Sequence, residues 1–426
     1  MSQLSDLSDP DLRALHERVR EEHAAFVKRG LKLNMARGKP APEQLDLSEA
    51  LLRLPGEGEH AASDGTDVRN YGGLAGLPET RALFAQILDV DPRNVIVAGN
   101  SSLSMMHDHV VFALLKGVPD SPQPWGREPI KFLCPVPGYD RHFSVCEEHG
   151  IEMIPVPMDD EGPVMDEVER LVKEDASIKG MWCVPKYSNP TGVVYSPDVV
   201  RRLAAMETAA PDFRILWDNA YVVHHLTEER IELTNLVTAC AEAGHPNRPL
   251  VFASTSKVTF AGGGLAAFTS SRANVDWFVA RMSKRMIGPD KVNQLRHAKL
   301  LPDLDAVHRL MDAHREILAP KFRTVIETFT AKLSDPRVAR WTEPKGGYFI
   351  SLDLPPGCAK RCAELAKEAG IVMTPAGAAF PYKKDPEDRN LRIAPSFPSA
   401  GEVAQAAEGI AVSALVAATE KALADR

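Results

Sequence analysis

Short apolar runs recur through the first three hundred residues, separated by stretches in which apolar positions follow helical spacing. The runs are bounded by polar or turn residues, which is typical of buried strands. They lie at 95–99, 131–136, 152–157, 180–185, 214–218, 249–254 and 265–270. Helical patterns separate several of them, including 78–88, 166–172 and 197–206. This alternation predicts an α/β fold, with a mostly parallel sheet covered by helices on both faces.

The pattern changes beyond residue 304. Long charged helices are expected at 304–333, followed by a strand pair around 341–354 and helices at 358–369 and 402–423. These elements predict a second, smaller α+β domain. An amphipathic helix at 4–29 should pack against that domain, since chain termini often meet. We therefore expect an N-terminal segment at 1–50, a large domain at 51–303 and a small domain at 304–426.

The composition excludes several classes of protein. In 426 residues, 44% hydrophobic and 25% charged side chains, with 28 Gly and 33 Pro, are incompatible with a collagen-like or mostly disordered chain. A net charge of −8 argues against nucleic-acid and anionic-membrane partners, because both need a basic surface. No apolar run is long enough to cross a bilayer.

The six cysteines have neither the spacing of a disulfide framework nor that of a zinc site. Cys358 and Cys362 stand four apart, but no second pair of ligands follows to complete a metal site. The N-terminus is polar and charged and lacks the apolar core of a signal peptide. We therefore expect reduced thiols, no metal and a cytoplasmic location.

Three polar motifs each follow a strand-like run. They are Asn-Pro-Thr-Gly at 189–192, Asp-Asn-Ala-Tyr at 218–221 and Ser-Thr-Ser-Lys at 254–257. Each motif alone is a weak signal, but all three at strand ends, followed by Asn-Leu-Arg at 390–392, indicate one ligand site. Open α/β sheets bind their ligands at the carboxyl ends of the strands.

This constellation resembles the fold type I pyridoxal-phosphate enzymes and, within them, the class I aminotransferases. The likeness covers most of the chain and includes LNMARGKP (33–40), YGGLAGLPETR (71–81), VAGNSSLSMM (97–106), PGYDRHF (137–143), PKYSNPTGVVYS (185–196), WDNAY (217–221), STSK (254–257), GGYF (346–349) and NLRIAPSFPS (390–399). The segments STSKVTFAGGG, GPDKVNQLRH and LRIAPSFPS are most similar to a bacterial subgroup of aspartate aminotransferases, with a domain also related to MocR-type aminotransferases.

The resemblance implies a sheet of the seven-stranded type in the large domain, which would bind pyridoxal 5'-phosphate. It also implies a homodimer with shared active sites. The substrates would be an amino acid and a 2-oxo acid. The reaction would be ping-pong transamination between aspartate and 2-oxoglutarate.

The resemblance assigns roles around the cofactor ring. Lys257 would form the internal aldimine and then carry the proton released at the substrate Cα, a task that suits a lysine whose pKa is depressed by burial. Asp218 would keep the pyridine nitrogen protonated, although a helix N-cap is the alternative role for this aspartate. Asn189 and Tyr221 match the donors to the phenolic oxygen, and Tyr139 would stack on the ring.

The cofactor phosphate requires amides, hydroxyls and positive charge. Asn100, Ser101 and Ser102 lie between a strand and a helix, so their amides would face an anion at a helix N-terminus. Ser254 would add a hydroxyl. By resemblance, Tyr71 would reach the phosphate of the opposite subunit.

One departure from the family pattern follows Lys257. Most class I members place an arginine seven or eight positions later, where this chain has glycines at 262–264 and then Leu265. We interpret these glycines as a close backbone approach. The missing charge is then supplied from elsewhere or not at all, and the hydroxyls of Ser256 and Thr259 are candidates to compensate for it.

Arg392 is the principal candidate for substrate binding, because a guanidinium holds a carboxylate by two parallel hydrogen bonds. By resemblance, Gly38 closes over the substrate, with Asn189 beside it. Arg37, Arg141 and Lys186 are candidates for binding a distal carboxylate. A surface or cofactor-side role remains open for each of these three cations.

Other functions stay open at this stage. Alanine, aromatic and aminoadipate-type donors use the same scaffold, and PGYDRHF also suggests a pyridoxal-phosphate-dependent lyase. A non-enzymatic sensor of the MocR type would need a winged-helix DNA-binding domain, for which the first 30 residues are too few and too acidic. We therefore favour an enzyme.

Overall fold

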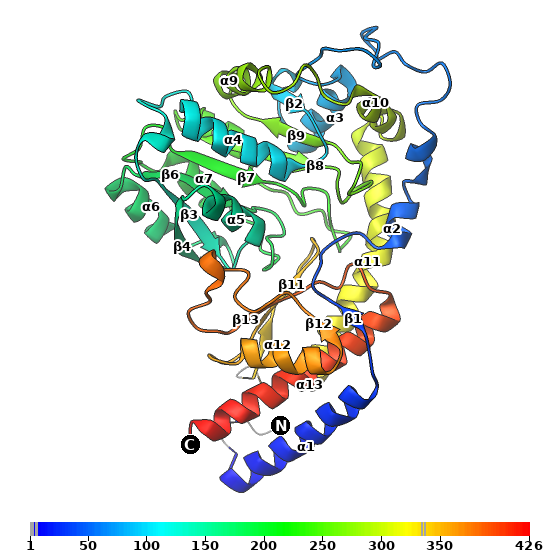
Figure 1. Cartoon of the computed structure of the whole chain (residues 1–426), viewed down its shortest axis with the longest axis vertical. Coiled ribbons are helices and arrows are strands. Elements are labelled where there is room, and N and C mark those ends of the chain that lie inside the picture. Colours follow the sequence, from blue (N-terminus) through cyan, green and yellow to red (C-terminus); the bar gives the residue numbers. More distant parts are fainter. Residues whose placement is uncertain (1–3, 5–6, 334, 336–337) are drawn as a thin grey trace.

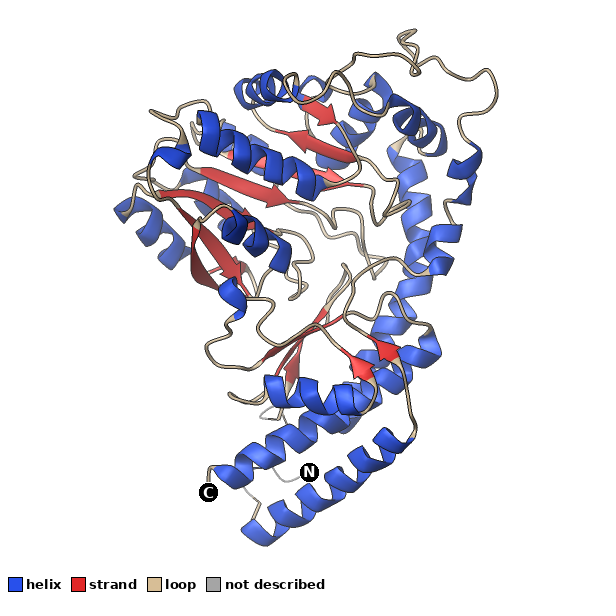
Figure 2. Cartoon of the chain, in the orientation of Figure 1, coloured by secondary structure: helices blue, strands red, loops and turns tan. Residues whose placement is uncertain are grey.

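The structure is a computed structural model that describes residues 4, 7–333, 335 and 338–426. Its central sheet has the strand order β2-β9-β8-β7-β6-β3-β4-β5 (Figures 1 and 2). The strands are β2 Val95–Val97, β3 Lys131–Val136, β4 Glu152–Asp159, β5 Gly162–Pro163, β6 Ile178–Cys183, β7 Arg214–Asp218, β8 Pro249–Ser254 and β9 Ala266–Thr269. All but β5 and β9 run in one direction. The α/β prediction is confirmed, and the strand beyond the expected seven is the two-residue β5, which turns back on β4.

Helices cover both faces of this sheet because successive strand residues point to opposite sides. In β7, Leu216 packs in one core with helices α4 Ser102–Lys116, α5 Asp140–Glu148 and α9 Arg272–Met282. Its neighbours Ile215 and Trp217 pack in the other core, with α6 Met165–Glu174, α7 Pro197–Ala205 and α8 Leu236–Glu242. The sheet is therefore buried on both faces, which explains its continuous apolar runs.

The remaining elements lie around this sheet or in the lower half of Figure 1. A three-stranded antiparallel sheet joins β10 Arg340–Trp341, β11 Ile350–Asp353 and β13 Asn390–Ile393. The other elements are α1 Asp9–Lys28, β1 Leu33–Asn34, α2 Pro42–Asp46, α3 Pro78–Leu88, α10 Lys291–Leu300, α11 Leu304–Lys332, α12 Ala359–Glu368, β12 Ile371–Val372 and α13 Ala400–Ala424, with short 3₁₀ turns at 49–53, 92–94, 125–127 and 381–383.

The N-terminal segment lies against these later elements. Helix α1 begins after Ser8, whose hydroxyl caps the amide of Asp11, and it runs beside α13 (Figure 1). Phe26 shares a core with residues of α11, α12 and α13, and β1 pairs with β12 in parallel. The helix expected at 4–29 thus begins at Asp9, and the first part of the expected range lies partly outside the described residues.

Helix α11 connects the two regions of the molecule. Val307 and Met311, near its start, pack with Val258 of the large sheet's loops. Phe322 and Phe329, near its end, belong to the core of the three-stranded sheet. The domain boundary expected at 304 therefore falls at the start of a helix that serves both cores, and the division into domains stays a prediction.

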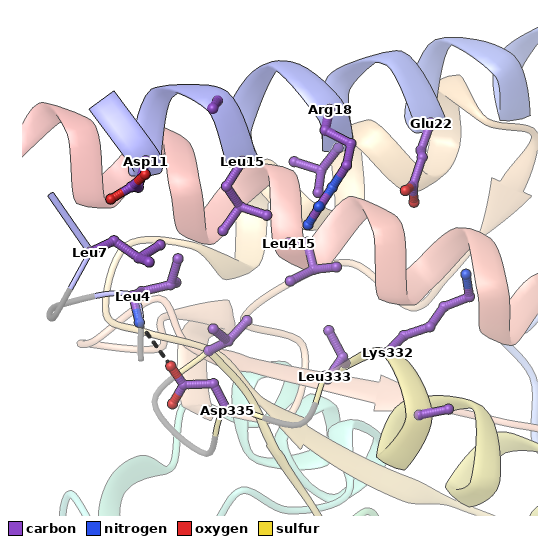
Figure 3. Close-up of a pocket in the computed structure, with 14 residues that line it drawn as sticks. Leu4, Leu7, Asp11, Leu15, Arg18, Glu22, Lys332, Leu333, Asp335 and Leu415 are labelled. Atoms are coloured by element: carbon purple, nitrogen blue, oxygen red, sulfur yellow. Dashed lines mark hydrogen bonds between the residues drawn. The ribbon is translucent and has the colours of Figure 1, made fainter. Parts of the chain in front are cut away.

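An apolar groove lies between the N-terminal segment and the end of α11, with Leu415 of α13 also lining it (Figure 3). It encloses about 730 Å³ and is lined by leucines, with Asp11, Arg18 and Glu22 at its rim. The amide of Leu4 donates to Asp335 Oδ2 at 2.9 Å, which ties the segment to the loop after α11.

No helix in the described part of the chain has the length and apolar character that crossing a membrane requires.

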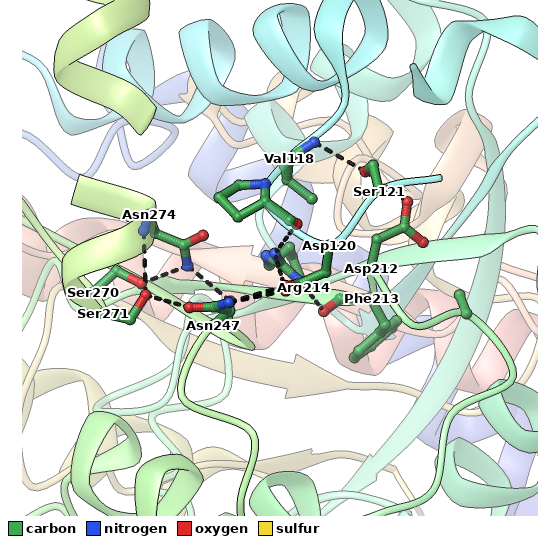
Figure 4. Close-up of polar contacts among 12 residues, drawn as sticks. Val118, Asp120, Ser121, Asp212, Phe213, Arg214, Asn247, Ser270, Ser271 and Asn274 are labelled. Atoms are coloured by element: carbon green, nitrogen blue, oxygen red, sulfur yellow. Dashed lines mark hydrogen bonds and ion pairs between the residues drawn. The ribbon is translucent and has the colours of Figure 1, made fainter. Parts of the chain in front are cut away.

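A buried polar network closes the amino end of β7 (Figure 4). Arg214, which is 1% exposed, donates to Asp120 Oδ2 at 3.0 Å and to the carbonyl of Phe213. The neighbouring Asp212 accepts from Ser121 and from the indole of Trp125. Because buried charges require such partners, this end of the strand is structural, and the other end is free to carry chemistry.

Candidate active site

A cavity of about 250 Å³ lies at the carboxyl ends of β7 and β8. It brings together residues from all three strand-end motifs. The residues that line it are Ser101, Ser102, Leu103, Tyr139, Arg141, Val184, Asn189, Asp218, Ala220, Tyr221, Ser254, Ser256 and Lys257. Parallel strands place their carboxyl ends on one edge, which is why motifs 29 and 39 residues apart meet here.

Lys257 lies in the turn that follows β8. Its Nζ is 4.8 Å from the centre of the Tyr221 ring. Surrounding protein atoms lower the pKa of Lys257, because burial penalises the ammonium, while the charge of Asp218 opposes that shift. The amine is thus less costly to deprotonate than a surface lysine, as a proton carrier requires.

Asp218 is the last residue of β7 and is 3% exposed. Its Oδ2 lies 3.0 Å from His142 Nε2, and the ring of His142 stacks on Trp182 with centroids 4.4 Å apart. Within the described residues Asp218 Oδ1 has no hydrogen-bond partner. No helix begins at Asp218, so the alternative role as an N-cap is wrong.

His142 is a site residue that the sequence analysis missed. It follows Tyr139 by three residues, which is about one helical turn, and the two rings meet edge to face at 4.9 Å. The motif PGYDRHF carried the signal, because a histidine one turn after an aromatic cavity residue lies on the same helix face. In this structure that histidine is His142, the hydrogen-bond partner of Asp218.

Tyr139, Asn189 and Tyr221 form the walls of the cavity. Asn189, which is 2% exposed, precedes a cis peptide bond to Pro190. Burial raises the pKa of Tyr139 to about 12 and holds that of Tyr221 well above its usual range. Both phenols are therefore neutral hydrogen-bond donors at physiological pH.

The N-terminus of α4 forms another wall. Ser101 caps this helix through its hydroxyl, which accepts from the amide of Ser104 at 3.3 Å. Ser256 Oγ donates to the carbonyl of Asn100 at 3.1 Å, and this bond joins the turn containing Lys257 to the same end of the helix. Free amides at a helix N-terminus favour an anion, so this wall suits a phosphate.

Two predicted phosphate contacts are placed differently. The side-chain amide of Asn100 donates to the carbonyl of Gly262 at 3.3 Å and does not line the cavity. Thr259 is fully buried, and its hydroxyl contacts Thr255 and His297 Nε2 at 2.9 Å. Thr259 is therefore not available to replace the missing arginine, because hydrogen bonds to Thr255 and His297 occupy its buried hydroxyl.

Arg392 lies in β13 and is 8% exposed. Its Nη1 donates to Asp140 Oδ1 at 2.7 Å and to Asn189 Oδ1 at 3.2 Å. Its Nη2 reaches Thr374 Oγ1 at 3.4 Å, and its Nε has no partner among the described residues. Arg392 thus borders the cavity through Asn189, and Asp140 is a second contact that the sequence analysis missed.

Gly38 closes this side of the site. A Cβ at Gly38 would lie 2.3 Å from Cζ of Phe349, so a larger residue requires the ring to move. The same ring lies 5.0 Å from the guanidinium of Arg392. The glycine permits the N-terminal loop to approach the aromatic ring that packs on the arginine.

The three candidate cations for a distal carboxylate are separated in space. Arg141 lines the cavity and forms no ion pair with a described residue. Arg37 is exposed and does not line the cavity. Lys186 donates to the carbonyl of Val222 and lines a different cavity, so its expected role at the substrate is wrong. Tyr71, 81% exposed, also lies outside the cavity of a single chain.

Comparison with known proteins identifies the family. A family model described as aspartate amino-transferase matches residues 7–426. The chain belongs to this family. A putative aminotransferase of Mycolicibacterium smegmatis is 56% identical over 99% of both chains, and an aspartate aminotransferase of Corynebacterium glutamicum is 49% identical over 98% of this chain and 96% of its own.

Solved structures agree with this assignment. The crystal structure of an aspartate transaminase from C. glutamicum superposes with a TM-score of 0.97 at 49% identity and covers 99% of both chains. The α-aminoadipate aminotransferase LysN of Thermus thermophilus, complexed with N-(5'-phosphopyridoxyl)-L-leucine, shares the fold with a TM-score of 0.73 at 22% identity, over 95% of this chain and 98% of its own. The predicted family and fold are thereby confirmed.

Family membership implies pyridoxal 5'-phosphate as the cofactor, and the residues present fit it. The unpartnered, buried Oδ1 of Asp218 is an acceptor for a protonated ring nitrogen. The N-terminus of α4, with Ser101 and Ser102, is suited to a phosphate. Lys257 lies in the same cavity as both groups. The donor set therefore matches the two ends of the cofactor.

Proposed function

We propose that this enzyme transfers the amino group of aspartate to 2-oxoglutarate, with pyridoxal 5'-phosphate as cofactor. The observation that carries the proposal is the placement of Lys257 and the unpartnered Asp218 Oδ1 in one cavity. The name of the C. glutamicum relative supports aspartate as the donor. The likeness to MocR-type regulators would concern only their aminotransferase-like domain.

The proposal assigns each wall of the cavity to one part of the cofactor. Asp218 would hold the ring nitrogen, and Tyr139 would cover the ring face. Asn189 and Tyr221 would donate to the phenolic oxygen, as neutral donors in a buried site can. The phosphate would bind Ser101, Ser102, Ser254, Ser256 and the amides of α4.

Bound pyridoxal 5'-phosphate supplies an electron sink for the pair left when the substrate Cα loses its proton. Lys257 is the residue that takes and returns this proton, because its burial lowers the pKa of the amine. Asp218 preserves the positive charge of the ring nitrogen, and His142 fixes the orientation of that carboxylate. Tyr139 and Val184 help to exclude water.

Arg392 would bind the α-carboxylate of either substrate through its guanidinium. Arg141 is then the favoured partner for the distal carboxylate, because it lines the cavity without an ion pair among the described residues. Both substrates named in the proposal carry two carboxylates, so two arginines at one cavity support a dicarboxylate pair. Gly38 would close over the bound substrate.

We further propose a cytoplasmic homodimer. All six cysteines are buried and free, which suits a reducing compartment. Tyr71 is a large aromatic residue exposed at 81%, and a partner subunit's cavity would give it a role. The chain lacks the arginine that most class I members carry after Lys257, so a donor from a second subunit would complete the phosphate site.

An amino-donor panel with 2-oxoglutarate as acceptor tests the proposed function. We expect aspartate to give the highest kcat/KM and to convert the cofactor to pyridoxamine phosphate in the absence of acceptor. Arg141→Met should reduce kcat/KM for aspartate more than for alanine, with Arg37→Met as the matched control. Greater activity with alanine, aromatic or aminoadipate-type donors would refute aspartate as substrate, and ammonia release without pyridoxamine phosphate would indicate a lyase.

A further inference from the structure

A second cavity lies on the other side of the loops that carry Asp218 and Asn189. It encloses about 560 Å³ between the carboxyl end of α3, the segment 222–237 and the start of α11. Its polar lining includes Lys186, Asn219, His225, Arg230 and His308. None of these five residues lines the cavity of Lys257, so the proposed transamination leaves them without a role.

Lys186 is the unusual residue of this cavity. It is 6% exposed, and its Nζ donates to the backbone oxygen of Val222 at 2.8 Å. No described carboxylate forms an ion pair with it, and the two carboxylates that line the same cavity, Asp89 and Glu232, are exposed to solvent. A buried ammonium without a counter-charge is costly, so its persistence beside an open cavity indicates an anionic ligand.

The charges around Lys186 reinforce this conclusion. Arg230 lies at the rim, where its two terminal nitrogens contact His308 Nδ1 at 2.8 Å and Asp312 Oδ2 at 3.1 Å. Burial lowers the pKa of His225 to about 4, and the positive charges of Lys186 and Arg230 lower it further. Asp312 neutralises part of the Arg230 charge, whereas Lys186 has no such partner among the described residues.

Two further features define the ligand. Asn219 is 6% exposed and lines the cavity. Its Oδ1 has no partner in the described part of the chain, so it can accept a hydrogen bond from a ligand. Val222, Val223, Leu233 and Leu304 provide apolar wall. The volume lies within the range of small-molecule sites and is too large for an inorganic anion alone.

We infer that this cavity binds a hydroxylated phosphate monoester. Its phosphate would pair with Lys186 and Arg230, because both cations face the same space. A hydroxyl of its organic part would donate to Asn219 Oδ1, and the carbon skeleton would lie on the apolar wall. The site is separate from the substrate cavity and does not depend on the transamination proposed above.

Calorimetric titration of the cofactor-loaded enzyme with glycerol 3-phosphate tests this inference. The cofactor already fills its own phosphate site under these conditions. We expect saturable binding that persists when a dicarboxylate such as maleate saturates the substrate cavity. Lys186→Met should weaken the association about 10- to 100-fold, the usual weight of one hydrogen bond to a charged group. Lys345→Met, which removes an exposed lysine paired with Glu229, should bind as the wild type does.

Arg230→Gln provides a second variant in case Lys186→Met does not fold, and it should also weaken binding. Glycerol without phosphate should not bind, and inorganic phosphate should bind more weakly than the monoester. The inference is overturned if the wild type does not bind glycerol 3-phosphate, if maleate displaces it, or if both variants bind as tightly as the wild type. Aspartate turnover by Lys186→Met without phosphate ester should stay normal, which separates this test from that of the proposed function.

Discussion

Replacing Asp140 by asparagine should strengthen the binding of every carboxylate substrate. Asp140 Oδ1 lies 2.7 Å from Nη1 of Arg392, the group proposed to bind the α-carboxylate. The aspartate therefore neutralises part of the arginine's charge and repels an incoming carboxylate. Asparagine keeps the size of the side chain and removes this anion. Arg392 retains its contacts with Asn189 and Thr374, so it should stay in place.

The expected magnitude follows from the exposure of the pair. The Arg392 side chain is 9% exposed, but that of Asp140 is 35% exposed, so solvent screens much of the attraction. Partly exposed ion pairs are worth about 0.5–1 kcal/mol, which corresponds to about a two- to fivefold fall in KM. The fall should be similar for aspartate and 2-oxoglutarate, and kcat should change little, because the effect concerns binding in the ground and transition states alike.

Steady-state kinetics with both substrates, at fixed ionic strength, measure this effect. Asp140→Glu is the control, because it retains the anion and should leave both KM values near those of the wild type. A rise in KM on Asp140→Asn would refute the reasoning, since it would mean that Asp140 holds Arg392 in its binding position. A change limited to one substrate would place Asp140 at the side chain of that substrate instead of at its α-carboxylate.

Three further predictions concern the cofactor. Lys257→Ala should lose at least about 10²–10⁴-fold in single-turnover transamination, the usual contribution of acid–base transfer, and near-normal turnover would contradict its role. His142→Asn should preserve the fold by circular dichroism but slow proton removal from the substrate Cα in stopped-flow absorbance, because Asp218 loses its buried 3.0 Å partner; an unchanged rate would show that His142 serves packing alone. Tyr71→Phe should weaken cofactor affinity by about 0.5–1.5 kcal/mol in equilibrium dialysis, and mixing it with Lys257→Ala chains should restore activity in hybrid dimers. Failure to complement under subunit exchange would exclude shared active sites.

The apolar pattern and the order of the motifs were sufficient to predict the sheet and the edge at which its polar motifs meet. The continuous apolar runs of β7 and its neighbours must be buried on both faces, which requires helices on each side. The order of strands and motifs then places Asn189, Asp218 and Lys257 at one edge, because parallel strands end together. The local sequence pattern was sufficient to predict the strands and the motifs at their ends, since each depends on residues that are close together in the chain.

Contacts between side chains that are distant in the sequence could not be predicted from the pattern and became visible in the folded chain. Arg392 meets Asp140 although 252 residues separate them, and His142 meets Asp218 across 76 residues. Lys186 and Thr259 carry the same functional groups as residues that line the cavity of Lys257, yet Lys186 lines a second cavity and Thr259 contacts His297. Strand pairing and helix packing set these distances and orientations, and a one-dimensional pattern contains neither.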